Sequence, residues 1–441
     1  MVHRVGLGLV RSRFHRRLTR FATMLIPALL LAMPCLQTPP IVDLPAIELG
    51  HWRAELESPG GALPFGLDVQ SAKDGLAVWI VNGSERIQIP NVKLRAGMLT
   101  LDMDHYQSRI TAKLDEDGRG LTGTWRKAGA KKQQTEMEFF AEWGDAPRFP
   151  ADEEAIDPGQ TRKLEGRWLV RFSSSEEPAV GVFSAGKDGR ATGTFLTSLG
   201  DYRFLAGSFR SGRLRLSCFD GAHAFLFDAL MSEAGYLRGD FWSRDTWHES
   251  WSAELNSEAK LSDPFGLSVW NDKVSVDSLS FFNPDTMEMA SLGDKEFAGP
   301  VRLIQLFGTW CPNCHDEAPF LSELWRTYHD QGLQIVGLAF EHSASKKIAI
   351  TQIRRFSEKH AIPYPVLVGG TSDKKEATDS FRGLKEVIAY PTVLFVDSTG
   401  RVRKIHTGFT GPAAGALHER EKERFHELIR DLLEEAASKK R

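Results

Sequence analysis

The sequence has no large excess of charge of either sign. Its 55 Lys and Arg residues nearly balance 58 Asp and Glu residues, for a net charge of −3 at pH 7. Duplex binding depends on clustered positive charge, so this balance argues against nucleic acid as the main partner. The 441 residues are too many for one hydrophobic core and predict two or three domains.

Acidic residues are absent before Asp43, whereas basic residues gather at the start of the chain. An apolar segment of 13 residues follows at 21–33, shorter than the roughly 20 residues that a helix needs to cross a bilayer. The basic residues are Arg4, Arg11, Arg13, Arg16, Arg17 and Arg20. This order predicts a secretory signal over 1–34 and an exported protein, periplasmic or membrane-anchored. The alternative is an uncleaved membrane anchor.

The end of this segment also offers a lipidation site. Residues 31–35 resemble a bacterial lipobox, in which Cys35 would carry the lipid. Such boxes have a small residue just before the cysteine, and this chain has Pro34 there. Anchoring through the N-terminus is therefore open between a lipid, an uncleaved signal and none.

Three sequence blocks recur in order at nearly one offset. Trp52 and Trp168 each follow a glycine by two residues and lie 116 positions apart, and Gly123 and Gly239 have the same offset. Between them, the alternating segments that begin at Gly97 and Gly212 match at an offset of 115. Ordered blocks at one offset indicate an internal repeat. We therefore predict two copies of one module, at 50–144 and 165–255.

Each predicted copy is rich in strands. Residues 98–103 and 214–218 alternate apolar and polar side chains, which places one face of a strand on a core. Turn signals recur about every 8–12 residues, as expected for a meander or small barrel of about eight strands per copy. Residues 145–164, rich in Pro, Asp and Glu, are the predicted linker between the copies.

From about residue 265 to 441 the pattern changes to alternating strands and helices. Strands are predicted at 301–307, 333–340 and 364–368, with a hairpin at 392–396 and 402–407. Helices are predicted after 310, at 348–360 and around 425–436. The fold class is thus two repeated all-β modules, barrel-like or meander, followed by an α/β thioredoxin-like domain.

A Cys-x-x-Cys motif lies between the first of these strands and the helix that follows. Two intervening residues wound into a helical turn bring Cys311 and Cys314 within disulfide reach. The free N–H groups and positive dipole at a helix start stabilise a thiolate, and Pro312 suits the first turn because its missing N–H is not needed there. We therefore predict Cys311 as the nucleophile and the deeper Cys314 as the resolving thiol.

The segment Phe307–Pro319 resembles the active site of the TlpA/ResA-like branch of the thioredoxin superfamily. The segments Tyr390–Thr392 and Asp397–Gly400 share the resemblance, which covers about 270–435 and leaves the β modules outside it. It implies a redox-active disulfide, no cofactor or metal, protein dithiol and disulfide substrates, and a membrane electron donor.

The resemblance also implies roles for residues around the motif. It implies a cis bond before Pro391, with Tyr390 free to pair with a substrate strand, so Trp310, Tyr390 and Pro391 are candidate substrate-binding residues. It implies that Glu317, three residues after Cys314, assists proton transfer.

One residue departs from the classical pattern. Gln305 replaces the buried Asp of classical thioredoxin, so proton transfer is left to Glu317 or water. Glu341 is a weaker candidate, and we expect a solvated carboxylate at the end of a strand.

Other interpretations of the cysteines are weaker. The motif followed by His315 also fits c-type haem attachment, but the sequence offers no clear distal ligand. A zinc site would need about two more ligands, and no second Cys-x-x-Cys motif or His pair follows. His315 is therefore expected to be a tuning or surface residue. Cys218, aligned with Met103 of the first copy, is expected to be an inert core thiol.

Two functions remain open at this point. The first is an exported thiol–disulfide oxidoreductase that reduces protein disulfides, with the β modules as docking or spacer domains. The alternative is a surface or periplasmic binding protein whose β modules carry the main function beside an accessory redox domain.

Overall fold

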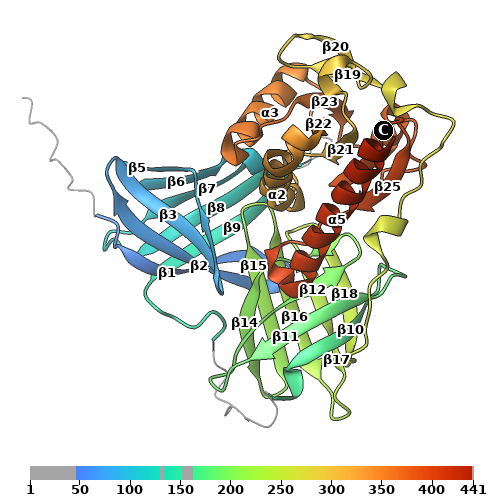
Figure 1. Ribbon diagram of the computed structural model, residues 1–441. Coiled ribbons are helices and arrows are strands. Elements are labelled where there is room, and N and C mark those ends of the chain that lie inside the picture. The colour runs from blue at the N-terminus through green and yellow to red at the C-terminus, as the bar shows by residue number, and fades with distance from the viewer. Residues whose placement is uncertain (1–45, 130–133, 151–161, 440–441) are drawn as a thin grey trace, which may run out of the picture. The chain divides into compact units, whose positions relative to one another are not determined.

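The computed structural model describes residues 46–129, 134–150 and 162–439. All of them belong to one compact unit, Leu44–Arg441. The predicted signal at 1–34, Cys35 and the part of the linker at 151–161 lie outside the described residues. Two all-β sheets come first along the chain and an α/β domain follows (Figure 1), which confirms the predicted order of fold types.

The first sheet is a nine-stranded meander in the order β4-β3-β2-β1-β9-β8-β7-β6-β5. Its strands are β1 Gly50–Ser58, β2 Gly61–Ala72, β3 Gly75–Asn82, β4 Glu85–Gln88, β5 Asn91–Arg95, β6 Met98–Met103, β7 Ser108–Leu114, β8 Gly120–Ala128 and β9 Gln134–Trp143. Along β1, Trp52, Ala54 and Leu56 are fully buried, while Arg53 and Glu55 between them reach solvent. This alternation places the core on one face of the sheet. A short 3-10 turn, η1 (Asp104–Tyr106), joins β6 to β7.

The second sheet also has nine strands, in the order β11-β10-β18-β17-β16-β15-β14-β12-β13. They are β10 Gly166–Phe172, β11 Ala179–Ala185, β12 Arg190–Thr197, β13 Gly200–Asp201, β14 Leu205–Arg210, β15 Arg213–Phe219, β16 Ala224–Met231, β17 Leu237–Ser243 and β18 Trp247–Leu255. An additional pairing of β11 with β12 closes the ring of strands into a barrel. Closure removes the two free edges that an open sheet would expose. Each of the two sheets thus has nine strands, where the sequence predicted about eight per copy.

The two sheets share local features at the recurring sequence positions. Trp52 Nε1 donates to Glu48 O and Trp168 Nε1 donates to Leu164 O, both over 3.0 Å. Glycine is required in both sheets where β7 meets β8 and β16 meets β17. A Cβ on Gly123 would lie 2.0 Å from the carbonyl oxygen of Thr111 on β7. A Cβ on Gly239 would lie 1.9 Å from the carbonyl oxygen of Asp228 on β16.

The α/β domain is built on a seven-stranded sheet in the order β20-β19-β23-β22-β21-β24-β25. Its strands are β19 Ser280–Asn283, β20 Glu288–Ser291, β21 Val301–Phe307, β22 Leu333–Glu341, β23 Val366–Thr371, β24 Thr392–Val396 and β25 Val402–Thr407. The central strands β21, β22 and β23 run parallel, and β24 and β25 form the predicted hairpin. All seven residues of β21 are buried, as expected for a strand covered on both faces.

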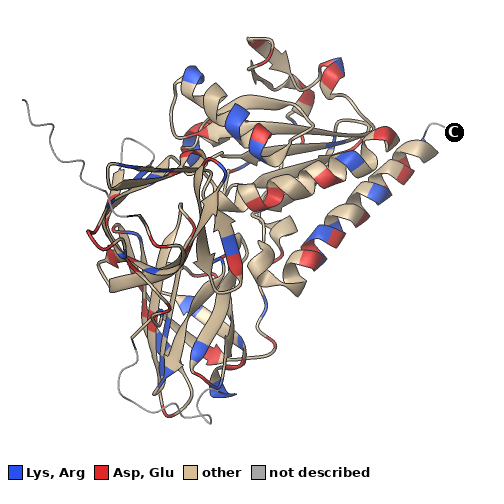
Figure 2. Cartoon of the chain, turned by 90° about the vertical axis from the view of Figure 1, so that its left-hand side faces the viewer, with Lys and Arg blue, Asp and Glu red and all other residues tan. Residues whose placement is uncertain are grey.

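Four helices complete this domain. They are α2 Pro312–Tyr328, α3 Lys346–His360, α4 Lys374–Ser380 and α5 Ala416–Ser438. Helices α2 and α3 pack against each other and on β22, whereas α5 packs on β21. Figure 2 shows acidic and basic residues interspersed along α5, the helix that ends at the C label. Among the described residues, no helix has both the length and the apolar character needed to cross a membrane.

A buried arginine joins all three folded parts. Arg203, 8% exposed, forms ion pairs with Glu85 of the first sheet (3.0 Å), with Asp220 of the second (3.4 Å) and with Asp316 of α2. Burial would lower the pKa of Arg203, but Asp316, Glu85 and Asp220 together raise it well above its usual range. Because three carboxylates share one guanidinium, burial still raises the pKa of Asp316 and of Glu85.

We expect Arg203→Ala to lower the free energy of unfolding by about 3–5 kcal/mol, because it leaves buried carboxylates without their cation. Urea unfolding followed by circular dichroism measures this. The matched control is Arg190→Ala, whose side chain is 86% exposed, with an expected change of about 0.5 kcal/mol or less. Equal effects of the two substitutions would show that Arg203 does not hold the parts together.

Candidate active site

The two cysteines of the motif lie at the junction between β21 and α2. Cys311 caps the helix, and its Sγ accepts the backbone N–H of Cys314 at 3.3 Å. Pro312 occupies the first helical position, as predicted from its missing N–H. No disulfide joins Cys311 and Cys314 in the structure. The predicted placement of a dithiol at a helix start is therefore found in the structure.

The two thiols differ in burial. Cys311 is 5% exposed, whereas Cys314 is fully buried. Burial raises the pKa of Cys314 well above its usual range, and the hydrogen bond and charge of Cys311 raise it further. Cys314 therefore holds its proton until a base removes it. Cys218, by comparison, is buried in the core of the barrel, as expected for an inert thiol.

The candidate substrate-binding residues lie on the segments next to Cys311 and next to the cis peptide bond. The Tyr390–Pro391 peptide bond is cis, as the resemblance implies, and Cys311 Sγ donates to Tyr390 O at 3.5 Å. Trp310 Nε1 donates to Phe340 O at 2.9 Å, and its ring stacks on His342 with 4.3 Å between centroids. The structure thus places Tyr390 at the Cys311 sulfur, and the Trp310 ring packs edge-on against the Tyr390 ring with 5.8 Å between centroids.

Glu317 lies one helical turn beyond Cys314 and is fully buried. Its Oε2 accepts Gln305 Nε2 at 2.7 Å, while its Oε1 has no hydrogen-bond partner. Burial raises the pKa of Glu317 to about 8, opposed by the Gln305 hydrogen bond and reinforced by Glu421. The Gln305 contact was not predicted. The sequence does hold a signal for it: a side-chain amide on a strand that is buried on both faces needs a hydrogen-bond partner inside the protein.

The expectation of a solvated Glu341 is wrong. This carboxylate is 1% exposed and accepts hydrogen bonds from Thr309 N at 3.0 Å and Thr309 Oγ1 at 2.7 Å. Burial raises its pKa, although both Thr309 bonds oppose that effect. Glu341 therefore holds the loop two residues before Cys311, and its burial arises from that loop folding back over the end of β22.

His315 is buried, so the surface interpretation of this residue is wrong. Its Nε2 lies 2.9 Å from Thr309 O and its Nδ1 lies 2.6 Å from His360 Nε2. Burial, followed by the charges of Lys359 and His360, lowers the pKa of His315 well below its usual range. Tyr106 of η1 packs edge-on against the His315 ring, with 4.8 Å between centroids. The first β sheet therefore shields the residue next to Cys314.

The second β sheet also contacts the redox motif. Gly200, the first residue of β13, forms a parallel bridge with Phe409, and Asn313 Nδ2 donates to Phe409 O at 3.3 Å. A Cβ on Gly200 would lie 2.1 Å from Asn313 Nδ2, so this approach requires glycine. The neighbouring Asp201 accepts the N–H of Gly411. Sequence reasoning gave no signal for these contacts.

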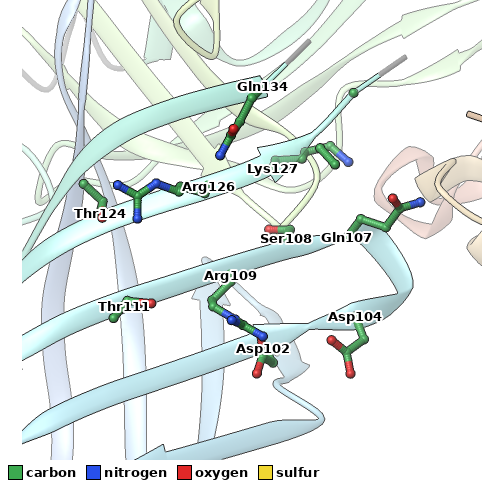
Figure 3. Close-up of a pocket in the computed structure, with 12 residues that line it drawn as sticks. Asp102, Asp104, Gln107, Ser108, Arg109, Thr111, Thr124, Arg126, Lys127 and Gln134 are labelled. Carbon is green, nitrogen blue, oxygen red and sulfur yellow. The ribbon is translucent and has the colours of Figure 1, made fainter. Parts of the chain in front are cut away.

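A separate cavity of about 570 Å³ lies on β6, β7 and β8 of the first sheet (Figure 3). Figure 3 shows Arg109 directed toward Asp102, and these two residues form an ion pair. Arg126, also in the wall, pairs with Glu136 at 2.6 Å. No cysteine is among the residues that line this polar cavity, so we assign the cavity no part in the redox chemistry.

Domains that combine this strand order with a dithiol at the start of a helix are those of thioredoxin-like redox proteins. The Redoxin family matches residues 285–417, a span that includes both cysteines. This domain of the chain is therefore similar to thioredoxin-like thiol–disulfide oxidoreductases.

Curated relatives carry the same assignment. The thiol-disulfide oxidoreductase ResA of Halalkalibacterium halodurans is 24% identical over 33% of this chain and 72% of its own length. The thioredoxin-like protein YneN of Bacillus subtilis is 29% identical over 27% of this chain and 63% of its own. ResA of Geobacillus thermodenitrificans is matched over 58% of its length. A solved thiol:disulfide interchange protein from Chlorobium tepidum aligns with 36% of this chain and 96% of its own, at 20% identity and a TM-score of 0.27.

We expect Glu317 to make stability fall as pH rises from about 4.5 to 8. Over that range the folded protein keeps a proton that the unfolded chain has released, so the free energy of unfolding falls by up to about 1.4 kcal/mol per pH unit. Glu317→Gln should remove this slope, as measured by urea unfolding at several pH values. The exposed Glu323 of the same helix supplies the control, Glu323→Gln. Parallel pH profiles for wild type and Glu317→Gln would contradict a raised pKa.

Proposed function

We propose that this protein is an exported thiol–disulfide oxidoreductase that reduces disulfides in other proteins. The observation that carries the proposal is the Cys311 sulfur, held at a helix N-terminus beside Tyr390 O, with a buried thiol and a buried carboxyl behind it. The Redoxin match falls on this domain, so it favours redox chemistry over the binding-protein alternative.

In the first step, the Cys311 thiolate attacks one sulfur of a substrate disulfide. A mixed disulfide forms on Cys311, the substrate S–S bond breaks, and the second substrate sulfur leaves as a thiolate that takes a proton from water. The positive end of α2 stabilises the attacking thiolate. Trp310 and the Tyr390–Pro391 loop form the surface on which the substrate lies.

In the second step, Cys314 attacks Cys311 Sγ and releases the other substrate sulfur. The proton of Cys314 passes to Glu317, whose pKa of about 8 leaves some of it ionised near neutral pH. Two electrons have then moved to the substrate, and the protein holds a Cys311–Cys314 disulfide. A dithiol donor, which we place at the membrane, reduces this disulfide for the next cycle.

The same proposal covers the rest of the chain. We infer that 50–144 and 165–255 are copies of one β module, joined by a linker at 145–164 and followed by the redox domain at 265–441. The matched hydrogen bonds of Trp52 and Trp168 support the repeat. The arginine-rich start and the apolar segment at 21–33 support export, with anchoring through Cys35 as one way to stay at the membrane.

The decisive experiment is a redox titration of the full chain, scored by alkylation of Cys311 and Cys314. A reversible two-electron transition near −270 mV, roughly the thioredoxin value, supports a reductase, whereas one near −120 mV indicates an oxidant. The absence of any transition would exclude the proposed chemistry.

Variants of the three described cysteines test the order of the steps. Cys311→Ser should abolish reduction of a protein disulfide, because it removes the nucleophile. Cys314→Ser should accumulate a mixed disulfide with the substrate, visible on a non-reducing gel, because nothing resolves it. Cys218→Ser is the control and should reduce substrate at the wild-type rate. Accumulation of the mixed disulfide with Cys311→Ser instead would reverse the assigned roles.

A further inference from the structure

A cavity of about 570 Å³ opens at the end of the barrel that faces the redox motif. Its aromatic wall consists of Tyr202, Phe225, Phe241 and Trp247. The redox domain contributes one lining residue, Asn313, which stands between the two cysteines of the motif. A molecule in this cavity therefore reaches the residue that separates the two cysteines in the sequence.

The acidic and imidazole groups in the wall already have partners. The carboxylate of Asp201 accepts the N–H groups of Gly411 and Arg203. Glu249 accepts hydrogen bonds from Ser174 at 2.5 Å and from Trp247 Nε1 at 3.0 Å. The third group, His223, has its Nδ1 3.0 Å from Asp220 Oδ2. Hydrogen bonds within the protein therefore hold each of these groups in place.

Arg244 is the exception among the charged lining residues. It stands at the turn between β17 and β18 with φ = 58°, is half-buried, and its guanidinium makes no hydrogen bond or ion pair within the described residues. Its charge also reaches the redox domain. Burial, Lys127 and Arg244 together lower the pKa of His342 to about 4, and His342 stacks on Trp310 beside Cys311. Burial lowers the pKa of Arg244, and the charge of Asp245 opposes that effect. The cavity thus combines aromatic rings with one cation that no hydrogen bond or close ion pair holds in place.

The position of the cavity relative to the cysteines is set by a short segment of the barrel. Gly200 forms its bridge with Phe409, and Asp201 accepts Gly411 N. A Cβ on Gly408 would lie 2.4 Å from Leu199 O, so the two backbones are in close contact there. The barrel wall and the redox motif therefore form one continuous surface.

We propose that this cavity recognises the substrate protein, holding an aromatic side chain near its target cysteine while Arg244 binds a neighbouring carboxylate. The aromatic rings supply apolar area and ring contacts, and the Arg244 guanidinium supplies the complementary charge. This inference rests on the proposed reductase function. It assigns the barrel a part in choosing the disulfide that Cys311 attacks.

The test compares two peptides that each contain one internal disulfide. One has Phe and Glu beside a cysteine, and the other has Ser and Gln at those positions. Pre-reduced full-length protein is mixed with each peptide, and oxidation of Cys311 and Cys314 is followed by acid quenching and alkylation. We expect the Phe/Glu peptide to react about tenfold faster, the scale expected for one buried anchor and one charged contact.

Substitutions in the wall should remove this preference. Trp247→Ala and Arg244→Gln should each bring the two rates to within about threefold of each other. Tyr236→Ala is the control for Trp247→Ala, since both aromatic residues lie at turns of the same barrel with 46% and 49% exposure. Arg238→Gln is the control for Arg244→Gln, because Arg238 lies on β17, the strand that ends just before Arg244. Both controls should keep the wild-type preference.

Two further measurements separate the possible failures. Hydroxyethyl disulfide, too small to fill the cavity, reports the redox chemistry alone, and no reaction with it would overturn the proposed function itself. Reaction with it but equal rates for the two peptides would overturn the recognition site only, as would a preference that survives both wall variants. Fluorescence anisotropy measures the affinity of peptides that carry serine in place of both cysteines and so cannot react. The Phe/Glu peptide should bind more tightly than the Ser/Gln peptide, and the folded wall variants should lose this difference.

Discussion

The arrangement of the described chain depends on one buried cation. The guanidinium of Arg203 meets Glu85, Asp220 and Asp316, which come from the first sheet, the second sheet and the helix of the redox motif. A buried charge is tolerated only when it is compensated, so separating any of these parts leaves charge uncompensated in a poorly solvated place. This constraint keeps the start of α2 against the β sheets. The contacts that cover the redox motif follow from that placement.

Loss of solvent has opposite effects on the acids and bases around the cysteines. Burial raises the pKa of Glu317 and of Cys314, and it lowers the pKa of His315. Each shift favours the uncharged form, so the region behind Cys311 is close to electrically neutral at rest. The start of α2 supplies positive potential at one sulfur only. Of the two thiols, Cys311 lies at the helix cap and is slightly exposed, whereas Cys314 is fully buried.

The parts of the fold that were predicted are those that local patterns determine. A continuous apolar run defined the strand 301–307, and the position of Pro312 marked where the helix begins, because both depend on nearby residues alone. The burial of Glu341 and of His315 was misjudged. Glu341 is covered by the loop containing Thr309, and His315 is covered by Tyr106, which is far away in the sequence. Neither partner can be found from a local pattern.

The order of the amino acids alone predicts the Cys311–Cys314 pair, the helix that presents it and the change from all-β to α/β structure near residue 265. Periodicity and motif spacing are properties of neighbouring residues, so the amino-acid order carries them directly. Only the tertiary structure decided that Arg203 joins three parts of the chain, that Gln305 partners Glu317, and that a barrel cavity opens beside Asn313. These features arise between residues distant in sequence, where burial and charge compensation select the partners.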